Sequence, residues 1–198
     1  MRFGAVQFDQ VMMAQTSIEV PRSIILVGLM GAGKTCIGRE LAGRLGIPFI
    51  DADTEIEAAA GCTIEDIFRL YGEHEFRDGE RRVLARLLDG STQVLATGGG
   101  AFMDPDTRKK ASEQAISVWL RADLDLLVSR VGRRSNRPLL RGKNANEVLR
   151  NLIDERYPIY AEADITVDSG REAPEFTVKR VIQELQEFLG SDNAESVL

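Results

Sequence analysis

One stretch constrains the fold of this chain most strongly, Gly28-Leu29-Met30-Gly31-Ala32-Gly33-Lys34-Thr35. It matches G-x-x-x-x-G-K-[ST], the pattern of a phosphate-binding loop. The apolar run at residues 23–27 before it predicts a short buried strand, and the apolar spacing at residues 36–45 after it predicts an amphipathic helix. A strand, a glycine-rich loop and a helix in this order are typical of an α/β protein that binds nucleotide phosphates.

The composition of the loop fits the ligand that it would hold. Glycines let backbone N–H groups come within hydrogen-bonding distance of a triphosphate, because no side chain obstructs the approach. Lys34 then reaches the β and γ phosphates, and the Thr35 hydroxyl is placed to ligate a magnesium ion that bridges them. The alternative is a glycine-rich turn that binds nothing. The motif predicts ATP or GTP binding by Gly31, Ala32, Gly33, Lys34, Thr35 and Cys36.

Composition limits the partners and the compartment. The chain has 198 residues and a formal net charge of -6, and its arginines form no long basic run, which argues against nucleic acid as a partner. No run of about 18 apolar residues is present, so no membrane span is predicted. Cys36, Cys62 and a single histidine predict neither a zinc site nor a disulfide, and free thiols fit the cytoplasm.

The chain alternates short apolar runs with amphipathic segments. Strands are predicted at residues 23–27, 46–50, 93–97, 115–120 and 164–167. Helices are predicted at residues 36–45, 54–60, 63–71, 73–88, 105–113, 123–131, 146–156 and 174–189, with a short turn or helix at 158–163. This order predicts a five-stranded parallel sheet with helices on both faces. Residues 1–21 are expected to form a disordered leader and residues 191–198 a C-terminal tail.

Three features follow predicted strands and are therefore expected at one edge of the sheet, where ligands bind in open α/β folds. They are the phosphate loop, the pair Asp51 and Asp53, and the turn Gly98–Gly100. The two aspartates are two residues apart in an expected extended segment, so their side chains should point the same way. One carboxylate could then hold the water shell of the metal ion, and the other could accept a proton from the acceptor hydroxyl. The alternatives are that Asp53 only caps the next helix and that the glycines form a flexible turn.

Arginines supply the remaining candidates. Residues 130–141 contain five arginines in twelve positions, and this basic stretch predicts a mobile lid at about residues 132–144 that brings guanidinium charge to a transferring phosphoryl group. A solvated charged face is the alternative. Arg77 lies three residues before Glu80 on a predicted helix, where an ordinary surface ion pair is the simplest interpretation.

Together these residues closely resemble the shikimate kinase family. The motifs occur in the family's order, with Gly-Leu-Met-Gly-Ala-Gly-Lys-Thr at 28–35, Asp-Ala-Asp at 51–53, Phe-Arg-Asp-Gly-Glu at 76–80, Gly-Gly-Gly at 98–100, Arg-Pro-Leu-Leu at 137–140 and Glu-Arg-Tyr-Pro-Ile-Tyr at 155–160. The resemblance covers about residues 23–189. It implies a P-loop kinase of the nucleoside monophosphate kinase type at residues 22–190. The implied reaction transfers the γ-phosphoryl group of ATP to the 3-hydroxyl of shikimate, on the route to chorismate and the aromatic amino acids.

The resemblance implies an acceptor site. In it, Asp53 binds the shikimate hydroxyls and acts as the base, while Arg77 and Arg156 clamp the carboxylate. Glu80 orients Arg77 or a substrate hydroxyl. The backbone of Gly98, Gly99 and Gly100 lines the same pocket.

The resemblance also implies a nucleotide site with Mg²⁺ and ATP. Lys34 and Arg137 stabilise charge on the transferring group, and Thr35 and Asp51 serve the magnesium ion directly or through water. Arg130 and Arg171 flank the adenine. A monomer is expected from the family.

The chain differs from the family pattern in two respects, and two other functions are alternatives. Many family members have a second hydroxyl residue where this chain has Cys36, and the leader has no family counterpart. A kinase for a related small molecule such as gluconate would share the phosphate loop, but it would not explain Arg77, Arg156 and the glycine turn together. A catalytically silent binding module should have lost Lys34, Asp53 or one of the arginines that clamp the carboxylate, and none of these is missing.

Overall fold

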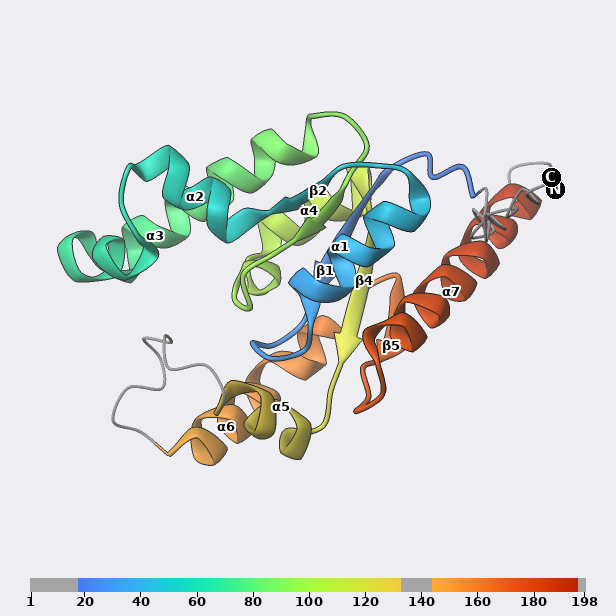
Figure 1. The fold of residues 1–198 in the computed structure, drawn as a ribbon. Coiled ribbons are helices and arrows are strands. Elements are labelled where there is room, and N and C mark those ends of the chain that lie inside the picture. The colour runs from blue at the N-terminus through green and yellow to red at the C-terminus, as the bar shows by residue number, and fades with distance from the viewer. Residues whose placement is uncertain (1–17, 133–143, 196–198) are drawn as a thin grey trace, which may run out of the picture.

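The structure is a computed structural model that describes residues 18–132 and 144–195 (Figure 1). Its centre is a sheet of five parallel strands in the order β2-β3-β1-β4-β5. The strands are β1 (Ser23–Val27), β2 (Phe49–Asp51), β3 (Val94–Ala96), β4 (Ala115–Arg121) and β5 (Ile165–Asp168). The predicted five-stranded parallel sheet is therefore confirmed.

Helices connect successive strands and cover both faces of the sheet. They are α1 (Lys34–Leu45), α2 (Ala52–Ala60), α3 (Ile64–Leu88), the short 3-10 helix η1 (Ala101–Met103), α4 (Pro105–Gln114), α5 (Leu124–Val131), α6 (Ala145–Tyr160) and α7 (Pro174–Glu195). Helices α1 and α7 lie side by side over one face, and α4 lies on the other (Figure 1). Parallel strands need such crossover helices, which is why both faces are buried.

The apolar sequence runs become the core. In β1, Ile24, Ile25 and Leu26 are fully buried, and Ile25 lies between Leu95 of β3 and Ser117 of β4. A second, smaller apolar cluster lies between α2 and α3, which project beyond the β2 edge of the sheet (Figure 1). Its buried members are Ile56, Ile67, Phe76 and Val83.

Helix boundaries follow the predicted capping residues. Thr63 accepts a hydrogen bond from the Asp66 N–H and begins α3, as the sequence predicts. Gly61 ends α2 in the left-handed conformation, with φ 68°. The helices predicted on either side of Gly72 are joined as α3, but Gly72 has non-helical backbone angles and marks a kink between them.

Several boundaries differ from the prediction. Helix α6 continues through Pro158 to Tyr160, because the buried Tyr160 packs into the core beyond the proline. Helix α7 continues to Glu195, so the predicted tail is helical over residues 191–195. Ile18 and Val20, assigned to the leader, pack against the core. The rest of the leader, residues 1–17, and lid residues 133–143 lie outside the described residues.

None of the helices in the described ranges combines the length and the apolar character needed to cross a membrane.

Candidate active site

The phosphate loop joins β1 to α1 and has the glycine conformations that its sequence predicts. Gly28, Gly31 and Gly33 all have positive φ angles. At Gly28, a Cβ atom would lie 2.7 Å from the Leu120 carbonyl oxygen, so the loop passes too close to β4 for any side chain. Lys34 Nζ donates to the carbonyl oxygens of Gly28 at 2.7 Å and Leu29 at 3.1 Å. Its ammonium group therefore lies inside the loop, where phosphates would bind.

The end of β2 places a carboxylate beside this loop. Thr35 Oγ1 donates to Asp51 Oδ2 at 2.9 Å, and the other oxygen of Asp51 accepts from the Asp53 N–H at 3.1 Å. Asp51 is thus the N-cap of α2, and Asp53 belongs to the first turn of that helix. The helix begins two residues earlier than predicted. The prediction that both aspartates lie in an extended segment is therefore wrong, and so is the alternative that Asp53 caps the helix.

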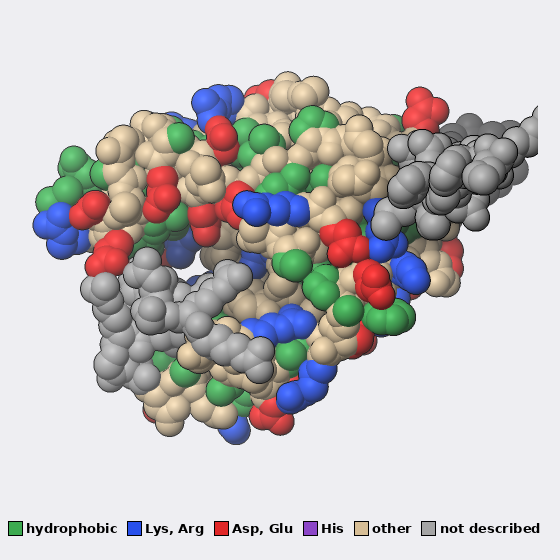
Figure 2. All heavy atoms as spheres, in the orientation of Figure 1, with side chains coloured by type: hydrophobic (Ala, Val, Ile, Leu, Met, Phe, Trp, Pro, Cys, Tyr) green, Lys and Arg blue, Asp and Glu red, His purple; other side chains and the backbone are tan. Residues whose placement is uncertain are grey.

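A cavity of about 440 Å³ opens along the carboxyl ends of the strands. Its walls come from the phosphate loop, Asp51, Asp53, Gly98, Gly99 and Arg130, all predicted for the site, and from Ala96 and Thr97, which were not predicted. Cys36 also lines it and is exposed. Basic and acidic side chains are interspersed over the face shown in Figure 2, which is hollowed near its centre.

The cavity wall also includes Glu172, Pro174 and Thr177, which were not predicted from the sequence. They follow β5, the last strand of the sheet. The available signal is their position after a parallel strand, because ligands in open α/β sheets bind beyond the carboxyl ends of the strands.

Arg130 connects the phosphate loop to that same segment. Its Nη1 donates to the Gly31 carbonyl oxygen at 3.1 Å and to Ser169 Oγ at 3.0 Å, and its Nη2 donates to the Gly170 carbonyl oxygen at 2.6 Å. The next residue, Arg171, is exposed and is not among the described residues that line the cavity. Arg137 lies outside the described residues.

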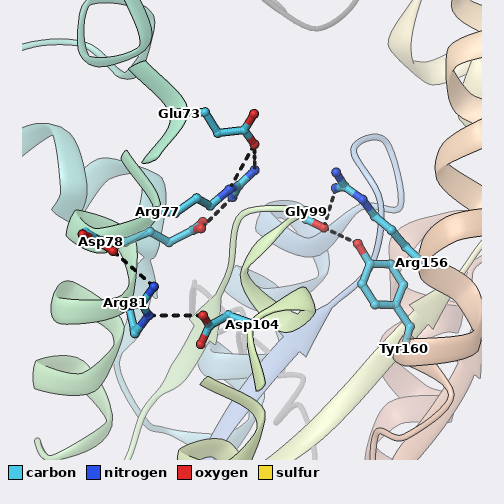
Figure 3. Close-up of polar contacts among 9 residues, drawn as sticks. Glu73, Arg77, Asp78, Arg81, Gly99, Asp104, Arg156 and Tyr160 are labelled. Atoms are coloured by element: carbon cyan, nitrogen blue, oxygen red, sulfur yellow. Dashed lines mark hydrogen bonds and ion pairs between the residues drawn. The ribbon is translucent and has the colours of Figure 1, made fainter. Parts of the chain in front are cut away.

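Two arginines approach the glycine turn from opposite sides (Figure 3). Arg77, on α3, lies so close to Gly100 that a Cβ atom there would be 2.5 Å from its Nη1. Arg156, on α6, donates from Nη1 to the Gly99 carbonyl oxygen at 2.8 Å. The turn Gly98–Gly100 therefore lies between two guanidinium groups that are far apart in the sequence.

Glu80 anchors one of these arginines. Arg77 Nη1 donates to Glu80 Oε2 at 2.6 Å, so the predicted ion pair forms, but it is not a surface pair because Glu80 is only 3% exposed. Burial raises the pKa of the Glu80 carboxyl; the positive charge of Arg77 opposes this and the negative charge of Asp53 adds to it. Within the described part of the chain, the second oxygen, Oε1, is buried without a hydrogen-bond partner.

The structure thus brings together two sets of groups at one edge of a five-stranded parallel sheet. The phosphate loop with Lys34 is one set. The other is the glycine turn with Arg77, its partner Glu80, and Arg156. This fold and site define a P-loop kinase of the nucleoside monophosphate kinase type.

Comparison with known proteins specifies the class further. The family model for shikimate kinase matches residues 30–186. The shikimate kinase of Paramagnetospirillum magneticum is 56% identical over 170 residues, which are 86% of this chain and 87% of that protein. The chain belongs to the shikimate kinase family and is an ATP-dependent phosphotransferase, as its motifs predict.

Solved structures agree with this assignment. The structure of shikimate kinase from Acinetobacter baumannii in complex with shikimate is 40% identical, with a TM-score of 0.81, and the match covers 84% of this chain and 93% of that chain. A gluconokinase from Sinorhizobium meliloti 1021 has a TM-score of 0.61 at 18% identity, with 90% of this chain and 99% of that chain covered. The gluconokinase shares the fold, and that likeness says nothing about the acceptor.

Proposed function

We propose that this chain transfers the γ-phosphoryl group of ATP to the 3-hydroxyl of shikimate, giving shikimate 3-phosphate and ADP on the route to chorismate and the aromatic amino acids. The main support is the position of the glycine turn between Arg77 and Arg156, with Asp53 next to Gly98 and in the wall of the same cavity as the phosphate loop. A small acceptor with a carboxylate and several hydroxyls matches that set of groups.

Arg77 and Arg156 bind the carboxylate of the acceptor. Planar guanidinium groups form paired hydrogen bonds with a carboxylate, which fixes its orientation as well as its position. Glu80 keeps Arg77 aimed at the turn through the hydrogen bond of 2.6 Å. Gly98, Gly99 and Gly100 offer bare backbone to the acceptor ring. At Gly98 a Cβ atom would lie 2.7 Å from Glu80 Oε1, and at Gly100 it would lie 2.5 Å from Arg77 Nη1, so side chains at these two positions would collide with charged groups.

Asp53 acts as the general base. As the 3-hydroxyl oxygen forms its bond to the γ-phosphorus, the hydroxyl proton passes to the Asp53 carboxylate, and the bond from that phosphorus to the β–γ bridging oxygen breaks to release ADP. The N–H groups of the phosphate loop and Lys34 stabilise the charge on the phosphates. Lys34 exchanges its bonds to the Gly28 and Leu29 carbonyls for bonds to phosphate oxygens. Arg137, outside the described residues, adds positive charge from the lid at residues 132–144.

Thr35 and Asp51 serve Mg²⁺, the cofactor of the reaction. Their oxygens lie 2.9 Å apart beside the phosphate loop, and one hydroxyl with one carboxylate fits an ion that takes its other ligands from water and phosphates. When bound, the ion neutralises charge on the β and γ phosphates. Arg130 and Arg171 flank the adenine, Arg130 from its position at the cavity wall.

The kinase domain extends over residues 22–190 and acts as a monomer in the cytoplasm, without nucleic acid or a membrane as a partner. Cys36 and Cys62 are both free thiols, which fits a reducing compartment.

A coupled assay of ADP release tests this activity. With magnesium and ATP present, shikimate is expected to support ADP release and gluconate is not. Release with gluconate alone would replace the proposed acceptor. No release with either acceptor, despite measurable ATP binding, would favour a catalytically silent binding module.

A further inference from the structure

The carbonyl groups of the glycine turn are held in two different ways. The Gly98 oxygen accepts from the Ala101 N–H at 3.2 Å and the Gly100 oxygen from the Met103 N–H at 3.1 Å, both within the short helix η1 that follows. The Gly99 oxygen has long-range donors instead, Arg156 Nη1 at 2.8 Å and the Tyr160 hydroxyl, both from α6 (Figure 3). The centre of the turn is therefore fixed by α6 and not by its own segment.

Tyr160 has no freedom to move away from this carbonyl. Its side chain is fully buried, and its ring packs against Trp119 and Tyr157 with centroid distances of 6.0 and 6.2 Å. Burial raises the pKa of the Tyr160 hydroxyl to about 12, with the nearby Arg156 opposing the shift. The hydroxyl therefore keeps its proton at neutral pH and remains a hydrogen-bond donor.

Arg156 has a second task that Tyr160 does not share. In the function proposed above, the Arg156 guanidinium binds the acceptor carboxylate, yet here one of its N–H groups is bonded to the Gly99 oxygen. If Arg156 were the only donor to the Gly99 oxygen, turning that N–H toward a substrate would leave this oxygen without a hydrogen bond. A buried carbonyl oxygen without a hydrogen bond is unfavourable. The Tyr160 hydroxyl satisfies the Gly99 oxygen in either position of Arg156.

We propose that Tyr160 is a positioning residue for the acceptor, whose hydroxyl holds the Gly99 carbonyl and so fixes the glycine turn while Arg156 engages the substrate carboxylate. This role rests on the proposed function, since it assigns a task to a residue that does not itself bind the acceptor. The simpler alternative is that Tyr160 is a core residue, important for stability alone.

Tyr160→Phe tests this role, because it removes one oxygen and keeps the ring that packs against Trp119. Tyr157→Phe is a matched control: Tyr157 also packs on Trp119, at 4.9 Å between centroids, and its hydroxyl also donates to a backbone carbonyl, that of Ala122, away from the turn. Both variants keep their rings, so both are expected to fold, and thermal melting checks this.

The expected result is a rise of about tenfold in the KM for shikimate in Tyr160→Phe. A factor of about ten corresponds to the loss of one hydrogen bond to a group that stays buried, here the Gly99 carbonyl oxygen. Its KM for ATP should stay within about twofold, and kcat should change little, because the turn contributes to binding before and during the reaction. Tyr157→Phe should leave both KM values unchanged. An unchanged KM for shikimate in Tyr160→Phe, with a loss of melting temperature like that of Tyr157→Phe, would overturn the role.

A second measurement covers a destabilised variant. If Tyr160→Phe melts below the assay temperature, the rise in melting temperature on adding shikimate should be smaller than in the wild type, while the rise on adding ATP should be the same. Equal shikimate shifts would overturn the role. If the wild type uses shikimate and Tyr160→Phe has the same KM and the same melting-temperature shift with shikimate, only the positioning role is refuted. A wild type that neither binds nor phosphorylates shikimate refutes the proposed function and this role together.

Discussion

At the scale of single residues, Glu80 shows how the fold changes the meaning of a common sequence pattern. An arginine followed three residues later by a glutamate predicts an exposed ion pair of little consequence. In the structure, Glu80 is buried, its pKa is raised by that burial, and Arg77 is directed toward the glycine turn. Which face of α3 is buried depends on α2, α4 and η1, which pack against it, and no local pattern specifies that. Arg77 and Glu80 could therefore be assigned only through their resemblance to a family motif.

Asp53→Asn tests the proposed base. The amide cannot accept the hydroxyl proton, so kcat should fall by about a hundredfold or more, the usual range for a general base. ATP affinity should be nearly unchanged, because Asp53 lies in the first turn of α2 and the hydrogen bond from the Thr35 hydroxyl goes to Asp51. Turnover numbers and ATP binding, measured on the same preparation, check both expectations.

Asp51→Asn is the matched comparison and should mainly weaken the use of magnesium and ATP. The assignment of Asp53 would be contradicted if its variant lost ATP affinity as strongly as it lost turnover.

At the scale of secondary-structure elements, most of the fold was predictable from local signals. Apolar runs predicted all five strands, and Thr63 and Gly61 predicted helix ends. The errors occur where tertiary packing outweighs a local signal. Pro158 should end a helix, yet α6 continues through it, because Tyr160 is held in the core and contacts the glycine turn. That contact is also the basis of the role proposed for Tyr160.

The kink in α3 provides a prediction at this scale. Gly72 has φ 85° and ψ 176°, a conformation that is available almost only to glycine, and no atom lies within 4 Å of the position that a Cβ would occupy. Gly72→Ala should therefore lower the free energy of unfolding by about 1–3 kcal/mol through backbone strain alone.

Gly79→Ala, in the same helix, is the control for that variant. Its Cβ would also meet no atom within 4 Å, but its φ is not positive, so alanine should be neutral or stabilising. Denaturant unfolding of both variants measures the difference. Equal effects on the two unfolding free energies would contradict the strain at Gly72.

At the scale of the whole molecule, the site is assembled from segments that only the topology brings together. The phosphate loop follows β1, Asp51 ends β2, the glycine turn follows β3, and the segment with Pro174 and Thr177 follows β5. Sheet order makes these ends neighbours, so the position of the site was predictable once five parallel strands had been recognised. The distances from Arg77 and Arg156 to the glycine turn were not predictable, because they depend on how α3 and α6 pack.

Acid stability is expected to depend on carboxylates spread over the molecule. Hydrogen bonds from Arg69, Lys110 and Arg121 lower the pKa values of Asp66, Asp89 and Asp168, respectively. A lowered pKa in the folded state gives stability that is present above the ordinary value of 3.8 and is lost as the pH falls through the folded value.

The free energy of unfolding should therefore decrease as the pH is lowered below about 4. Denaturant unfolding at several pH values measures this. The decrease should be smaller in high salt, because exposed pairs are screened. Unfolding free energies that stay constant or rise as the pH falls from about 5 to about 3 would contradict the role of these pairs.

The chemical identity of the product tests the central claim most directly. Phosphorus-31 NMR of a reaction with ATP, Mg²⁺ and shikimate reports which carbon carries the new phosphate, through the coupling between phosphorus and the proton on that carbon. The predicted result is a single phosphate monoester coupled to the proton on C3 of shikimate. ATP consumption without a monoester, or a monoester coupled to the proton on another ring carbon, would contradict the arrangement of Asp53, Arg77 and Arg156 proposed here.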